Sequence, residues 1–280
     1  MTKKPIDRVG EWTEVKLQII QDYAAAYSQI MAKQRVIKHY AYIDGFAGSG
    51  AHISRATGEE ICGSPAIALK TDPPFTYYHF IDLDGTKADC LRSLAGNRKD
   101  VSVYEEDCNT VLRERIFPDY QFNTYRRALC LLDPYDLNPH WEVIQAAAKM
   151  ETIDIFINFM ISDANRNIFL WNSDDVDPSQ LERMNLFWGD ESWKDVVYTT
   201  KSGLFGDIKE KAPNEVIAKA FQKRLVEVAG FKYVPDPVPM RNSKEVVLYY
   251  LFFASPNKTG AKIARAIFNK YRKQGIIYGS

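Results

Sequence analysis

A short apolar strand that ends in an acid and a glycine-rich turn constrains this chain more than any other stretch. Residues 40–43, Tyr-Ala-Tyr-Ile, have the aromatic and β-branched character of a buried strand. Asp44 follows them, and glycines stand at positions 45, 48 and 50. Because glycine has no Cβ, such a turn lets the backbone approach a ligand closely. The stretch therefore predicts a ligand-binding turn, with a tight strand-to-helix connection that binds nothing as the alternative.

The spacing of the glycines narrows the choice of ligand. No lysine follows Gly50, which excludes a Walker phosphate loop, and the full Gly-x-Gly-x-x-Gly pattern of dinucleotide sites is missing. A carboxylate beside the turn would repel a pyrophosphate and favour a cationic amine. The combination resembles motif I of class I S-adenosylmethionine-dependent methyltransferases. The resemblance implies that the turn binds this cofactor through Asp44, Gly45, Phe46, Ala47, Gly48, Ser49 and Gly50.

Composition limits the class of protein. The 280 residues, 46% of them hydrophobic, suffice for one large α/β domain with a sizeable core. Lys plus Arg and Asp plus Glu both number 36, and this zero net charge argues against bulk electrostatic coating of nucleic acid, though not against a local basic groove. The start lacks an apolar leader and no apolar run is long enough to span a bilayer, so we expect a cytoplasmic protein with no membrane contact. The four cysteines form no Cys-x-x-Cys pair, so we expect reduced thiols and no metal site.

Strands alternate with helices along most of the chain. An amphipathic helix is predicted over residues 11–34, ahead of the first strand. Four further core strands are predicted at residues 76–81, 101–104, 128–132 and 153–159, with helical segments between them. Two closing strands, at 231–234 and 246–253, are expected to pair antiparallel. The pattern predicts a doubly wound, Rossmann-like methyltransferase sheet of seven strands.

Two segments interrupt this alternation. Residues 51–62 are polar and are expected to form a loop before a helix that starts at 63–65. Residues 160–213 are rich in tryptophan, acids and asparagine, and predict a helical insertion packed over the strand ends. The insertion is interpreted either as a lid or substrate-recognition piece or as a structural cap. Because no linker is evident, residues 1–280 are expected to form a single domain.

Acids follow four consecutive core strands. They are Asp44, Asp82, Asp107 and Asp133. In an open parallel sheet, ligands bind in the crevice beyond the carboxyl ends of the strands. Each acid alone would equally suit a helix N-cap, but the set of four favours a common ligand site.

These acids have distinct expected partners in a bound cofactor. Asp82, or Asp84 two residues further on, is expected to accept hydrogen bonds from the ribose hydroxyls, as the acid after the second strand does in dinucleotide sites. Asp107 is expected to accept one from the adenine amino group, with Leu83 or Cys108 against the ring. Asp44 is expected near the amino-acid part of the cofactor.

Residues 133–135, Asp-Pro-Tyr, follow the fourth strand. They resemble motif IV of amino-methyltransferases, Asp/Asn-Pro-Pro-Tyr, with one proline missing. The resemblance implies catalytic roles for Asp133, Pro134 and Tyr135: an acid and a backbone carbonyl hold the target amine, and the aromatic ring stacks on a flipped base. The alternative for Tyr135 is a core or hinge aromatic.

Motifs along almost the whole chain are similar to those of the three-Cys-motif partner protein family. They are Trp-Thr-x-x-Lys-Leu at 12–17, the turn around Asp44, Gly-Ser-Pro-Ala at 63–66, Phe-Ile-Asp at 80–82, Leu-Leu-Asp-Pro-Tyr at 131–135 and Leu-Phe-Phe-Ala-Ser at 251–255. The resemblance implies a cytosolic prokaryotic protein with a methyltransferase fold, S-adenosylmethionine as cofactor, and a three-cysteine, radical-enzyme-like partner. It leaves the methyl acceptor open.

The acceptor is interpreted as a nucleic-acid base, a peptide or a small molecule. Basic side chains in the last helix, 259–274, and Arg126–Arg127 suit phosphate contacts, but a charged outer face is also ordinary for a surface helix. Three functions remain in view: an N-directed methyltransferase, a non-catalytic methyltransferase-fold partner protein, and an NAD-dependent dehydrogenase. The last is disfavoured by Asp44 and by the glycine spacing.

Overall fold

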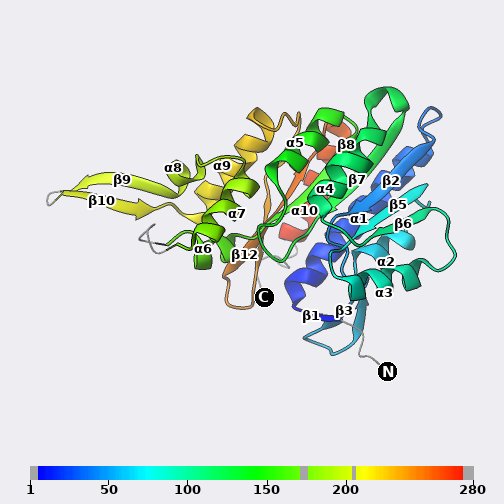
Figure 1. Ribbon diagram of the computed structural model, residues 1–280, viewed down its shortest axis with the longest axis horizontal. Helices are drawn as coiled ribbons and strands as arrows, with labels where there is room; N and C mark the ends of the chain where they lie inside the picture. The colour runs from blue at the N-terminus through cyan, green and yellow to red at the C-terminus, as the bar shows by residue number, and fades with distance from the viewer. Residues whose placement is uncertain (1–5, 171–175, 204–205, 274–280) are drawn as a thin grey trace.

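The computed structural model describes residues 6–170, 176–203 and 206–273 (Figure 1). Its centre is a seven-stranded sheet in the order β11-β12-β8-β7-β2-β5-β6. The strands are β2 (His39–Asp44), β5 (Tyr77–Ile81), β6 (Val101–Tyr104), β7 (Arg126–Leu132), β8 (Ile153–Phe159), β11 (Val238–Arg241) and β12 (Val247–Ala254). β2, β5, β6, β7 and β8 are parallel, whereas β12 pairs antiparallel with both β8 and β11. This arrangement confirms the predicted doubly wound, Rossmann-like sheet of seven strands with an antiparallel last pair.

The apolar strands are buried on both faces. Along β2, Tyr40 and Tyr42 belong to one hydrophobic core, and Ala41 and Ile43 belong to the core on the opposite face. Successive side chains of a strand point to opposite faces of the sheet, so both sets must be apolar when helices cover both faces. This explains why the core strands were recognisable as continuous apolar runs.

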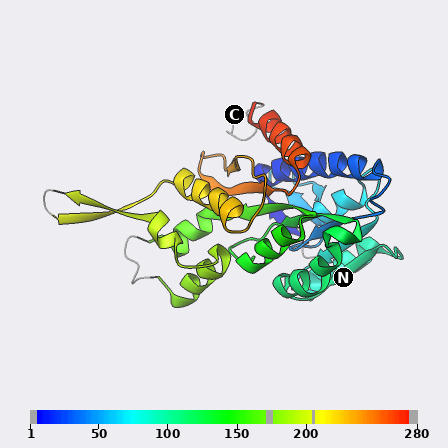
Figure 2. The ribbon, with the colours of Figure 1, turned by 90° about the horizontal axis from the view of Figure 1, so that it is seen from above.

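Helices cover the two faces of the sheet. One face carries α1 (Glu11–Ala32), α2 (Ser64–Leu69), α3 (Gly85–Ala95) and α10 (Lys258–Lys273). The other carries α4 (Cys108–Val111), α5 (Trp141–Met150), α6 (Ile161–Asn167) and α9 (Asn214–Glu227). α4 continues as a π-helical turn (Leu112–Ile116) and two 3-10 turns (Phe117–Tyr120 and Phe122–Thr124). Figure 2 shows α1 and α10 together on one side of the sheet and the green helices on the other. None of the helices in the described ranges is long and apolar enough to cross a membrane.

The segment predicted as a helical insertion contains an additional hairpin. Besides α6 it holds α7 (Pro178–Trp188), α8 (Trp193–Val197) and the antiparallel strands β9 (Tyr198–Gly203) and β10 (Gly206–Lys211). Trp188 and Trp193 are buried in the core beside the sheet, so these two aromatic residues are structural. The β9–β10 hairpin forms its own two-stranded sheet and projects away from the body of the protein (Figures 1 and 2). Residues 171–175 and 204–205 of the predicted insertion lie outside the described part of the chain.

Two sequence predictions were wrong in detail. Residues 51–62 form strands β3 (Ala51–Ser54) and β4 (Glu60–Cys62), which join β1 (Asp7–Val9) in a three-stranded sheet. Pairing with a distant amino-terminal strand leaves no local pattern that predicts it.

Residues 231–234 form no strand of the central sheet, because Tyr233 makes only an isolated bridge with Ser255. The edge strand is β11, where Pro239 is tolerated because one side of an edge strand needs no hydrogen-bond donor.

Candidate functional site

A cleft of about 620 Å³ opens at the carboxyl ends of β2, β5, β6 and β7. The sequence-predicted residues that line it are Gly45, Phe46, Ala47, Gly48, Asp82, Leu83, Asp107, Cys108, Asp133, Pro134 and Tyr135. Asp44, Ser49 and Gly50 are not among its lining residues. The structure thus brings together eleven of the fourteen predicted residues at the sheet edge where ligands of such folds bind.

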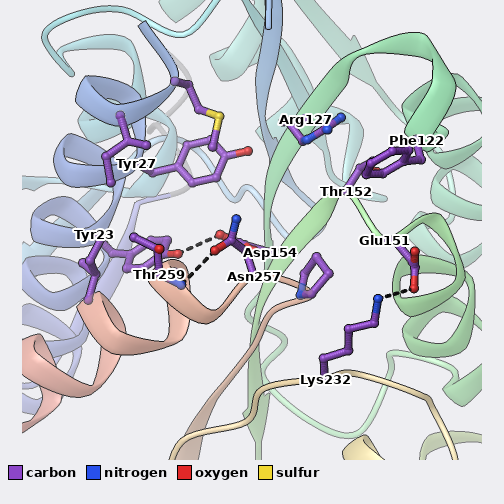
Figure 3. A pocket seen from close by; sticks show the side chains of 15 residues that line it. Tyr23, Tyr27, Phe122, Arg127, Glu151, Thr152, Asp154, Lys232, Asn257 and Thr259 are labelled. Carbon is purple, nitrogen blue, oxygen red and sulfur yellow. Dashed lines mark hydrogen bonds and ion pairs between the residues drawn. The ribbon is translucent and has the colours of Figure 1, made fainter. Parts of the chain in front are cut away.

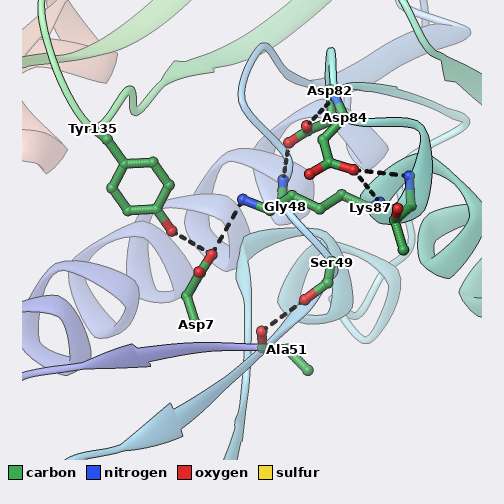
Figure 4. Close-up of polar contacts among 9 residues, drawn as sticks. Asp7, Gly48, Ser49, Ala51, Asp82, Asp84, Lys87 and Tyr135 are labelled. Atoms are coloured by element: carbon green, nitrogen blue, oxygen red, sulfur yellow. Dashed lines mark hydrogen bonds and ion pairs between the residues drawn. The ribbon is translucent and has the colours of Figure 1, made fainter. Parts of the chain in front are cut away.

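Backbone hydrogen bonds hold the glycine-rich turn over the strand ends. The Gly45 N–H donates to the Leu131 carbonyl at the end of β7, and the Ala47 N–H donates to the Ile81 carbonyl at the end of β5, both at 2.9 Å. Gly48 has a φ of +64°, which glycine adopts without strain. Its N–H donates to Asp82 Oδ2 at 2.8 Å (Figure 4). The acid that follows β5 therefore also fixes the turn that follows β2.

Asp44 lies beneath the turn. Its side chain is fully buried, and its Oδ1 accepts a hydrogen bond from the Phe46 N–H at 3.3 Å. No hydrogen bond of ordinary geometry reaches Oδ2 within the described residues. Burial raises the pKa of Asp44 to about 7, against the lowering effect of the Ser64 hydroxyl. Asp44 thus supports the turn from below, and its predicted position beside the amino-acid part of a cofactor stays a prediction.

Ser49 and Gly50 connect the turn to the small sheet. The Ser49 hydroxyl donates to the Ala51 carbonyl at 3.0 Å. Gly50 has a φ of +78°, and its carbonyl accepts from the Gly63 N–H at 2.9 Å. A Cβ at Gly63 would lie 2.9 Å from the Gly50 carbonyl carbon, so this close approach of two backbones needs glycine. These residues shape the turn and leave the cleft to residues 45–48.

The remaining strand-end acids divide into two roles. Asp84 caps α3, since its carboxylate accepts from the Thr86 and Lys87 N–H groups, and Asp107 caps α4 through the Thr110 N–H. The N-cap alternative therefore holds for both. Asp107 nevertheless also lines the cleft, as does Asp82, which caps no helix.

Apolar surface lies between these acids. Leu83 is 73% exposed at the cleft, an unusual position for a large apolar side chain. Cys108 is buried and also lines the cleft, and burial raises the pKa of its thiol, so the sulfur is neutral. Together they provide a surface on which a flat ring can lie.

Asp133 forms a polar network at the floor of the cleft that the sequence analysis missed. Its Oδ2 accepts from the Lys16 ammonium, and its Oδ1 accepts from the Asn158 side-chain amide. The Lys16 side chain, only 8% exposed, also lies 5.3 Å from the centroid of the Tyr249 ring. Two signals were available: Asn158 is an amide within the apolar strand β8, and Lys16 belongs to the Trp-Thr-x-x-Lys-Leu motif at 12–17, to which the sequence analysis assigned no role.

Tyr135 lies at the mouth of the cleft and is 66% exposed, so it is not a core residue. Its hydroxyl donates to Asp7 Oδ2 at 2.7 Å, and the Lys87 ammonium lies 3.2 Å from the same oxygen (Figure 4). The Lys87 ammonium is also 5.3 Å from the centroid of the Tyr135 ring. This group joins β1, α3 and the loop after β7 across the cleft opening.

The insertion contacts the same loop through one arginine. Arg183 on α7 lies 3.1 Å from Asp136 Oδ2 and 2.7 Å from Asp163 Oδ2 on α6. Asp136 immediately follows Tyr135, and burial raises its pKa. The insertion therefore helps to position the segment that carries Asp133 and Tyr135.

The polar and apolar groups that line the cleft suit a nucleoside cofactor. Carboxylates at Asp82 and Asp107, the apolar surface of Leu83, and a glycine turn with exposed backbone provide for hydroxyls, a flat ring and a short chain. The volume falls within the range of small-molecule sites, about 300–1,000 Å³. In the described ranges, no group of three or more His, Cys, Asp or Glu side chains is arranged to hold a metal ion.

Comparisons with known proteins give a likeness of fold. No family model and no curated protein matches the chain. Among solved structures, protein LPL1258 from Legionella pneumophila str. Philadelphia 1, of the family DUF519, has a TM-score of 0.52 at 10% identity, covering 91% of each chain. A proposed methyltransferase from Thermobifida fusca YX has a TM-score of 0.40 at 11% identity, covering 88% of this chain and 80% of the other. At these identities the first match shows a shared fold, and the second is too distant in structure to support more.

Proposed function

We propose that this protein is an S-adenosylmethionine-dependent methyltransferase that acts on nitrogen. The observation that carries the proposal is the composition of one cleft. It lies at the carboxyl edge of a methyltransferase-like sheet, with the glycine turn and Asp82 on one side and Asp133 and Tyr135 on the other.

Each part of the cofactor has a candidate partner. Asp82 would accept from the ribose hydroxyls, Asp107 from the adenine amino group, and Leu83 with Cys108 would contact the ring. The backbone of residues 45–48 would hold the amino-acid part. Bound S-adenosylmethionine would supply an electrophilic methyl group on a sulfonium.

Asp133 would orient the acceptor amine. Its two oxygens are each fixed by one donor, Lys16 or Asn158, and each retains a lone pair for an amine N–H. A carboxylate held in this way favours the positive charge that develops on the nitrogen. Because the carboxylate is already oriented, little rearrangement is needed when the acceptor binds. The Pro134 carbonyl would be a second acceptor, and the exposed Tyr135 ring would contact a flat acceptor.

We favour a nucleic-acid base as the acceptor. Arg8, Arg55 and Lys87 line the same cleft as Tyr135. An aromatic ring with cations around it suits a base that is stacked while its phosphates are contacted. A peptide amine is the competing acceptor.

Calorimetric titration with S-adenosylmethionine tests the cofactor assignment. We expect micromolar binding to the wild type and at least tenfold weaker binding to Asp82→Ala. Asp84→Ala is the matched control, because it removes an acid two residues away whose carboxylate caps α3. No binding to the folded wild-type protein would contradict the proposal, and so would equal losses in the two variants.

Transfer of a radiolabelled methyl group tests the acceptor. Nucleic-acid and peptide pools are supplied separately, and the labelled pool identifies the acceptor class. Asp133→Ala should abolish transfer while largely retaining cofactor binding; parallel loss of both would contradict the role of Asp133.

The projecting hairpin favours a second candidate, a non-catalytic partner protein. β9 and β10 pair only with each other in the described structure, and each leaves one edge for another chain. The resemblance to three-Cys-motif partner proteins would make the three-cysteine neighbour the other subunit. This alternative predicts a stable complex by gel filtration that is lost when residues 198–211 are replaced by a short linker, and unchanged by Asp133→Ala.

A further inference from the structure

A second cavity, of about 210 Å³, lies at the amino-terminal ends of the central strands, whereas the cleft lies at their carboxyl ends. Its walls come from α1, from the amino-terminal ends of β7 and β8, and from the first turn of α10 (Figure 3). No residue lines both this cavity and the cleft. It is therefore a separate site.

Tyr27 has an unsatisfied hydroxyl in this cavity. Its side chain is only 4% exposed, and its hydroxyl has no hydrogen-bond partner within the described residues. In Figure 3 the ring extends from α1 and directs the hydroxyl into the cavity. A buried hydroxyl without a partner is costly, so a bound group that completes its hydrogen bonding would be favoured.

Arg127 brings a positive charge to the same cavity. Its guanidinium donates to the Arg126 carbonyl at 2.7 Å and lies 5.2 Å from the centroid of the Phe122 ring. No carboxylate forms an ion pair with it in the described ranges. Burial and the Asp154 carboxylate raise the pKa of the Tyr27 hydroxyl, and the Arg127 charge lowers it less strongly. The guanidinium and the hydroxyl therefore lie within electrostatic reach of each other.

The first turn of α10 forms one wall of the cavity beside Asp154. Thr259 and Gly260 line the cavity, and they belong to the amino-terminal end of a 16-residue helix. Asn257 caps only the Thr259 N–H, at 2.8 Å. The positive end of this helix dipole already faces a carboxylate, because a Cβ added at Gly260 would lie 3.0 Å from Asp154 Oδ2.

The two acids of the cavity already have partners. Asp154 accepts from the Ser255 hydroxyl at 2.5 Å and from the Tyr23 hydroxyl at 2.7 Å. Glu151 forms an ion pair with Lys232 at 2.6 Å (Figure 3). Within the described ranges the Arg127 cation has no ion-pair partner and the Tyr27 hydroxyl has no hydrogen-bond partner, and both favour an anionic oxygen.

The rest of the lining is apolar. Ile30 and Met31 from α1 and Ile263 from α10 contribute to the wall. We propose that this cavity binds a small organic carboxylate, with its anionic group between Arg127 and the Tyr27 hydroxyl and its apolar part against Met31 and Ile263.

Benzoate is the probe for this site. Its binding to the whole chain is measured by ligand-observed NMR titration. Benzamidine has a similar shape and the opposite charge, and inorganic phosphate has the charge without the apolar part. We expect benzoate to bind with a dissociation constant in the millimolar range or below, and the two other probes to bind at least tenfold more weakly.

Substitutions assign the binding to the cavity. Arg127→Met should weaken benzoate at least tenfold, since it removes the cationic guanidinium, and Tyr27→Phe about threefold or more, since it removes one neutral hydrogen-bond donor. Tyr42→Phe is the matched control, because its buried hydroxyl also has no hydrogen-bond partner among the described residues, and Tyr42 lines neither site. Asp82→Ala, in the cleft, should leave benzoate binding unchanged.

Other outcomes would overturn the proposal. Absence of benzoate binding, or binding that neither Tyr27→Phe nor Arg127→Met weakens, would show that the cavity is only a packing defect. If benzamidine bound as tightly as benzoate, the cavity would not be an anion site. If phosphate bound as tightly as benzoate, the apolar wall would make no contribution to affinity.

Discussion

Lys16 and Asp133, separated by 117 positions in the sequence, form a buried ion pair at the floor of the cleft. Lys16 comes from the helix that covers one face of the sheet, and Asp133 follows β7. The exposed fractions of the two side chains are 8% and 17%. α1 therefore does more than cover the core, because it fixes the carboxylate on which the proposed acceptor site depends.

Replacing Lys16 with methionine should lower the free energy of unfolding by about 3 kcal/mol, because Asp133 would remain buried without its cationic partner. Urea unfolding at pH 7 measures the loss. Adding Asp133→Asn to this variant should restore part of the stability. Lys87→Met is the control: its partner Asp7 has a side chain that is 40% exposed, so that loss should stay within about 1 kcal/mol. Similar losses of stability in Lys16→Met and Lys87→Met would contradict the expectation that the buried ion pair contributes more than the exposed one.

Substitution of Gly48 separates backbone strain from ligand contact. Gly48 (φ +64°) and Gly58 (φ +73°) both adopt left-handed conformations with nothing within 4 Å of an added Cβ. Gly48→Ala and Gly58→Ala should therefore each cost about 1–2 kcal/mol of stability. Only Gly48 lines the cleft, so only Gly48→Ala should weaken S-adenosylmethionine binding in calorimetry. Equal affinities of the two variants for S-adenosylmethionine would show that the glycine-rich turn does not contact the cofactor.

Asp44 should make the stability of the protein depend on pH. Its folded-state pKa of about 7 lies above its ordinary value of 3.8, so between these values the folded state binds a proton that the unfolded chain does not. This contribution to stability is complete below pH 4 and is lost as the pH rises through 7. Asp44→Asn lacks this titration. Its stability relative to wild type should increase by roughly 2–3 kcal/mol between pH 5 and pH 8 in urea unfolding. A difference that stays constant across this range would show that Asp44 is not protonated when folded.

Tyr135→Phe should detach β1 from the cleft mouth with little global cost. It removes one hydrogen bond to Asp7 from a side chain that is 66% exposed, so we expect a loss of about 1 kcal/mol or less. Hydrogen exchange of the residue 7–9 amides should become faster, since the hydroxyl is one of the two contacts that hold Asp7. Unchanged exchange would mean that the pairing of β1 with β3 holds the strand by itself.

The sheet was predictable because burial on both faces leaves a local signature. Leu129 and Leu131 face one core and Ala128, Cys130 and Leu132 the other, so residues 128–132 of β7 form an unbroken apolar run in the sequence. The small β1–β3–β4 sheet and the β9–β10 hairpin escaped prediction, since their polar strands show no such run.

The candidate site was predicted only where the chain itself brings residues to the sheet edge. Asp82, Asp107 and Asp133 follow parallel strands, so their meeting at one edge follows from the strand pattern. Which of them also cap helices was not predictable, because an acid after a strand suits both roles.

The sequence by itself determined the doubly wound sheet and the edge at which the acids gather, because strand period and strand ends are local properties. Only the tertiary structure decided that Lys16 and Asn158 hold Asp133, that Asp7 holds Tyr135, and that Asp44 lies beneath the turn. Those contacts join residues from 25 to 128 positions apart, and Asp44 is enclosed by elements on both sides of β2. Such contacts are set by how distant strands, helices and loops pack together, and a local pattern such as the amide of Asn158 in an apolar strand marks a residue without identifying its partner.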